Sequence, residues 1–118
     1  MLSIEQASAV RSGAAWQIAW RVINPDPEPR EIRGAWLPHS GFRSAEWQIE
    51  PPLVVPAGGG VRLDSHVTCS DQAGTVVENA FLILRLADQR LFFRLRVTIQ
   101  PDGSPRAATE TITSQAPG

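Results

Sequence analysis

Apolar and polar positions alternate most regularly between Ala80 and Ile99, and this pattern predicts a single β-hairpin. We place its turn at Asp88-Gln89, so that Ala87 pairs with Arg90. The facing pairs on one side are then all apolar: Leu86/Leu91, Leu84/Phe93, Leu82/Leu95 and Ala80/Val97. A slip of one residue would mix the two faces. The hairpin therefore predicts an antiparallel sheet with one dry face.

The opposite face of this hairpin combines large apolar side chains with arginines. It carries Phe81, Ile83, Arg85, Phe92, Arg94 and Arg96. Such a face is too apolar for ordinary solvent contact, and arginine is enriched at interfaces. Either another segment of the chain or another subunit covers it. We favour an interface, because a one-domain chain has few residues for a third layer.

Two earlier segments also alternate like half-buried strands. Ala15 to Ile23 places Trp16, Ile18, Trp20 and Val22 on one side, and it ends before a loop with three prolines. In the segment from Ile32 to Leu37, Ile32, Gly34 and Trp36 share a face. We expect these faces to lie in the core, so that three of the four tryptophans are buried.

The remaining segments complete an all-β pattern. We expect a weak first strand over 2–10, proline-bounded edge segments near Trp47 and over 53–55, a regular strand over 61–69, and a polar last strand over 107–114. The strand over 61–69 points Cys69 inward and His66 outward. Roughly seven to nine short strands and little or no helix predict an antiparallel β-sandwich. We expect one domain over 2–114 and a frayed tail over 115–118.

Composition agrees with one globular domain. The chain has 118 residues, 42% of them hydrophobic, and a formal net charge of -1. That charge disfavours nucleic acid and anionic lipid as partners. The chain shows neither a secretory signal nor an apolar run of the roughly 20 residues a membrane helix needs. The cytoplasm is the default location, although a mature extracellular module would look the same.

Several features together resemble bacterial immunoglobulin-like β-sandwich modules. They are the Trp16 to Val22 strand, the loop at Asn24-Pro25, the turn Val55-Pro56-Ala57-Gly58-Gly59 and the long terminal hairpin. Trp36 lies where such sandwiches often place a core tryptophan, and the flanking cysteines of antibody domains are absent. The resemblance implies the architecture, and such modules usually serve in adhesion, spacing or partner binding.

The sequence favours no catalytic, cofactor or metal site. His39-Ser40 are neighbours in sequence, which rarely face each other as a base and a nucleophile do, so we interpret them as a polar turn. His66 and Cys69 are three apart on a strand and therefore point to opposite faces. We expect a protein that is not an enzyme and that has no cofactor.

Two functional hypotheses remain. The first is a non-catalytic module that binds a protein partner, or a second copy of itself as a homodimer, through the outer face of the hairpin at 80–99. The alternative is a carbohydrate- or small-ligand-binding domain. Its site would be the segment containing His39, Phe42, Arg43 and Trp47, in which Trp47 is the best candidate for an exposed ring.

Overall fold

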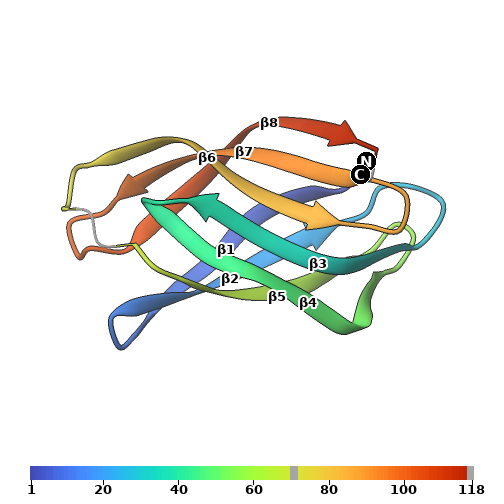
Figure 1. The fold of residues 1–118 in the computed structure, drawn as a ribbon, viewed down its shortest axis with the longest axis horizontal. Helices are drawn as coiled ribbons and strands as arrows, with labels where there is room; N and C mark the ends of the chain where they lie inside the picture. Colours follow the sequence, from blue (N-terminus) through green and yellow to red (C-terminus); the bar gives the residue numbers. More distant parts are fainter. Residues whose placement is uncertain (70–71, 117–118) are drawn as a thin grey trace.

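The computed structural model describes residues 1–69 and 72–116 and contains eight strands (Figure 1). They are β1 (Ser3–Ser12), β2 (Ala15–Ile23), β3 (Arg30–His39), β4 (Phe42–Val55), β5 (Gly60–Val67), β6 (Val76–Arg85), β7 (Arg90–Ile99) and β8 (Pro105–Gln115). The described residues contain no helix, and hence none that could cross a membrane. The expected tail at 117–118 lies outside the described residues, and Gln115 belongs to β8.

The strands form two antiparallel sheets, which confirms the all-β prediction. One sheet has the order β1-β2-β5, and the other has the order β4-β3-β6-β7-β8. Figure 1 shows the two layers of an elongated molecule that measures 41 × 23 × 23 Å. The edge strands β1 and β8 lie on one side of the sandwich, and β4 and β5 contact each other on the other side.

The core lies between the sheets and contains the predicted inward positions of β2. Trp20 is 1% exposed, contacts Phe42 edge-to-face at 6.2 Å, and donates its indole N–H to Ser65 Oγ at 2.9 Å. Trp16 is also buried, and the Arg11 guanidinium lies 4.5 Å from its ring centroid. The tryptophan hydrogen bond explains why a serine is tolerated among the buried side chains of β5.

The long hairpin forms with the predicted faces but with a register shifted by two residues. Leu84 pairs with Leu91 and Leu82 with Phe93, because the loop contains four residues, Leu86 to Gln89, instead of two. The amide of Leu86 donates to the Gln89 carbonyl at 2.9 Å, and the Leu86 side chain is buried. A shift of two residues preserves the alternation of side chains. The predicted pairs are therefore wrong, but the predicted buried face of the hairpin is correct.

A second difference concerns Trp36, whose predicted burial is wrong. The pairing of β3 with β4 shifts register between Ile32 and Gly34. This irregularity reverses the alternation, so that Ala35 and Leu37 enter the core with Ile32 and Trp36 turns outward. Trp36 is 36% exposed, which makes it the most exposed large aromatic side chain among the described residues.

The proline-rich segment of β4 is an edge, as predicted, but it does not end the strand. β4 continues through Pro51 and Pro52 to Val55, and its pairing with β3 skips from Gln48 to Leu53. Prolines cannot donate to a ladder, so the skipped stretch at the sheet edge accommodates them.

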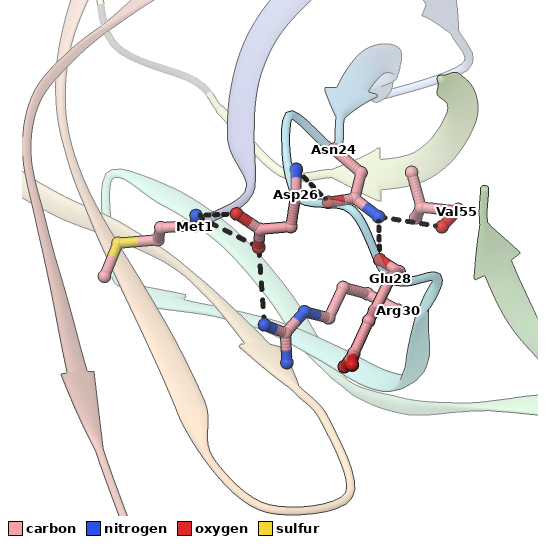
Figure 2. Close-up of polar contacts among 6 residues, drawn as sticks. All are labelled: Met1, Asn24, Asp26, Glu28, Arg30 and Val55. Atoms are coloured by element: carbon pink, nitrogen blue, oxygen red, sulfur yellow. Dashed lines mark hydrogen bonds and ion pairs between the residues drawn. The ribbon is translucent and has the colours of Figure 1, made fainter. Parts of the chain in front are cut away.

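The loop between β2 and β3 is fixed by Asn24, which is fully buried (Figure 2). Its side-chain N–H groups donate to the carbonyls of Glu28 at 2.8 Å and Val55 at 3.1 Å, and its Oδ1 accepts from the Asp26 amide at 3.0 Å. The N-terminal ammonium lies 2.9 Å from Asp26 Oδ1, and Arg30 also reaches this carboxylate. One asparagine therefore connects this loop to the end of β4.

Candidate functional site

An apolar row crosses the outer face of the five-stranded sheet. Trp36 on β3 pairs with Ile83 on β6, and Ile83 pairs with Phe92 on β7. Phe81 extends the row along β6 and contacts Phe92 edge-to-face, with ring centroids 6.5 Å apart. Ile83, Phe81 and Phe92 are partly exposed. We call Trp36, Phe81, Ile83 and Phe92 the outer apolar patch.

No described segment forms a third layer over this patch, because the eight strands account for two sheets only. One of the two expected explanations, cover by the chain itself, is thereby excluded for residues 1–69 and 72–116. The depression between Trp36 and Ile83 measures only about 10 Å³. This depression is therefore too small to hold a small-molecule ligand.

The arginines around the patch divide into two kinds. Arg94 and Arg96 lie in weak surface ion pairs with Glu110 at 3.7 Å and Glu78 at 3.6 Å. Arg85 and Arg90 face each other directly in the hairpin register. Within the described part of the chain, neither of these two has a carboxylate at ion-pair distance.

Gly34 determines where the Arg85 guanidinium lies. A Cβ atom at Gly34 would be 3.1 Å from Arg85 Nη2 and 3.1 Å from the Trp47 carbonyl oxygen. The missing side chain lets Arg85 cross over β3 and donate to Gln48 Oε1 and to the Arg33 carbonyl, both at 3.2 Å. Arg85 is thus held beside the apolar row by two neutral acceptors.

The alternative segment from His39 to Trp47 does not form one surface. Phe42, predicted as a ligand contact, is fully buried against Trp20, and this prediction is wrong because Phe42 opens β4 with its side chain in the core. His39 Nδ1 accepts the Gly41 amide at 2.9 Å, and Arg43 pairs with Thr68 through the backbone. Trp47 is half-buried and lines a different cleft from these residues.

His66 is exposed and Cys69 is buried, as the alternation over 61–69 predicts, although β5 itself ends at Val67. In the described ranges, no three His, Cys, Asp or Glu side chains come together in a way that could hold a metal ion.

No family model, no curated protein and no solved structure matches this chain. Function is therefore inferred from the chemistry of its surfaces.

Three residues of the outer apolar patch, Phe81, Ile83 and Phe92, could be predicted from the alternation of the hairpin. Trp36 could not be predicted, because Gly34 is the only local sign of the bulge that turns its side chain outward. Arg90 lies on the same face of β7 as Arg94, so the same alternation could have identified it as a residue of the outer face.

Proposed function

We propose that this protein is a non-catalytic interaction module that binds a second copy of itself through the outer face of the five-stranded sheet. The observation that carries the proposal is the uncovered row of Trp36, Ile83 and Phe92 across three adjacent strands. Aromatic side chains and arginine are the residues enriched in the centres of protein interfaces. Partner binding is also the usual role of the immunoglobulin-like modules that the sequence resembles.

The size of the face suits such a contact. Strands of 10 residues in β6 and β7, in a sheet of five strands, span roughly 700 Å² at the usual spacings. A standard protein interface buries about 800 Å² on each partner. The face therefore falls within the range of about 600 to 1,000 Å² per partner that specific interfaces bury.

The charges on the face favour a second copy over a one-sided acidic partner. Arg85 and Arg90 lack carboxylate partners among the described residues, while Glu46 lines the depression beside Trp36. Glu110 and Glu78 form ion pairs with Arg94 and Arg96. A surface with both signs of charge can complement itself around a twofold axis. The net charge of -1 sets up no strong repulsion between copies.

Sedimentation velocity over a range of protein concentrations tests this proposal. We expect reversible dimerisation of the wild type and at least about tenfold weaker association of Phe92→Asp, because a carboxylate would enter the apolar row. Val10→Asp is the matched control, since Val10 is 60% exposed on the other sheet. A wild type that stays monomeric at millimolar concentration, or equal weakening by the two variants, would contradict the proposal.

A further inference from the structure

A second surface lies at the edge of the sandwich where β4 and β5 contact each other. A cleft of about 430 Å³ opens there between β4 and β5. Its lining residues come from three strands and are Gln17, Ser44, Ala45, Trp47, Asp64, Ser65 and His66. The volume falls within the range of about 300 to 1,000 Å³ that is usual for small-molecule sites.

The cleft combines one aromatic ring with several planar polar groups. Trp47 is half-buried against the core, so its indole is held in place while part of it remains accessible. His66 and Gln17 face each other across β5 and β2, and Asp64 pairs with Ala19 two residue pairs away. Asp64 is held by Arg62 Nε at 2.8 Å.

Ser44 supplies an independent indication that the cleft takes a ligand. Its side chain is only 9% exposed, and its Oγ has no hydrogen-bond partner among the described residues. The other serine of the cleft is fully used, since Ser65 Oγ accepts from Trp20 and lies 3.4 Å from the Ile18 carbonyl. A buried hydroxyl without a partner costs stability, so its presence at a cleft calls for an explanation.

We propose that this cleft binds a neutral sugar ring, as a free monosaccharide or as one unit of a glycan. The face of an indole packs against the C–H groups of a pyranose, while Gln17, Asp64 and His66 offer donors and acceptors to its hydroxyls. Rotation about its χ1 would turn the buried Ser44 hydroxyl toward the ligand. No arginine or lysine lines the cleft and Asp64 is acidic, so anionic ligands are disfavoured. This inference does not rest on the proposed dimerisation.

Amide and indole chemical shifts in two-dimensional NMR test the inference. The probes are glucose, galactose, mannose and N-acetylglucosamine, each titrated into the millimolar range. We expect at least one of them to shift the Trp47 indole N–H signal together with the amides of Ser44 and His66. Both Trp47→Ala and Gln17→Ala should weaken that binding at least tenfold. Trp36→Ala, which removes an exposed indole on the outer face of the five-stranded sheet, should leave it unchanged.

Ser44→Ala separates a binding role from a structural one. Removing a hydroxyl that has no partner should leave the melting temperature unchanged or raise it, while the affinity for the sugar falls several-fold. A sugar panel that shifts none of these signals would overturn the inference. So would binding that survives Trp47→Ala, or an affinity that Ser44→Ala leaves unaltered.

Discussion

Replacing Asn24 tests the account of the β2–β3 loop most severely. Asn24→Ala removes three hydrogen bonds at once, those to the carbonyls of Glu28 and Val55 and that from the Asp26 amide (Figure 2). At about 1 kcal/mol for each bond, the loss in free energy of unfolding should be about 3 kcal/mol. That is a large share of the 5 to 15 kcal/mol that typically separates folded from unfolded domains.

The assay is urea unfolding followed by tryptophan fluorescence. We expect a lower midpoint with an unchanged m-value, since the folded state should remain equally compact. Glu28→Ala is the matched control in the same loop. Glu28 is exposed and contributes its backbone carbonyl, so its side chain should matter by less than about 0.5 kcal/mol.

Asn24→Asp is a second test of the same side chain. It keeps the acceptor for the Asp26 amide, but it replaces the donor NH₂ group with a carboxylate oxygen that faces two carbonyls. Its deficit relative to wild type should shrink at acid pH, where the protonated acid regains one donor. A loss below about 1 kcal/mol in Asn24→Ala, or one equal to that of Glu28→Ala, would refute the role assigned to this side chain.

Three further predictions follow from the core and the loops. Trp20→Ala should cost about 3 to 5 kcal/mol in urea unfolding, whereas Arg21→Ala should cost under about 1, and equal effects would mean that the faces of β2 are misassigned. The N-terminal ammonium, with a smaller contribution from Arg30, holds the pKa of Asp26 below its ordinary value of 3.8. The folded form therefore gains stability above the unfolded pKa and loses it as pH falls through the lowered one, a dependence that Asp26→Asn should flatten in acid titrations of unfolding. Cys69 is 6% exposed, so a thiol reagent should label the native protein slowly, and fast labelling without unfolding would contradict its burial.

The two-sided character of the strands could be predicted from the sequence, but their registers could not. Hydrophobic alternation determines which face of β6 and β7 is buried. A register shift of two residues leaves the same side chains on that face. The actual register depends on the buried Leu86 in the loop and on an irregularity before Ala80, where Asn79 has a φ of 57°. Neither feature is encoded in the local alternation of apolar and polar residues.

The candidate sites show the same limit. Trp36 is exposed because a bulge at Ile32 to Gly34 reverses the alternation of β3. Within that stretch, Gly34 is the only residue whose type indicates a bulge. Trp47 meets Gln17 and His66 only because edge strands of two different sheets come together. Contacts between residues this far apart in the chain follow from the topology, so the sequence suggested Trp47 without its neighbours.

Intermolecular nuclear Overhauser effects between isotope-labelled and unlabelled copies test the central claim most directly. In a mixed sample at a concentration where the dimer forms, we predict contacts from the Trp36 indole protons to the methyl groups of Ile83 and to the Phe92 ring of the other copy. These contacts should disappear in Phe92→Asp. A dimer whose intermolecular contacts map to Val10 and the three-stranded sheet, with none at Trp36, would contradict the account.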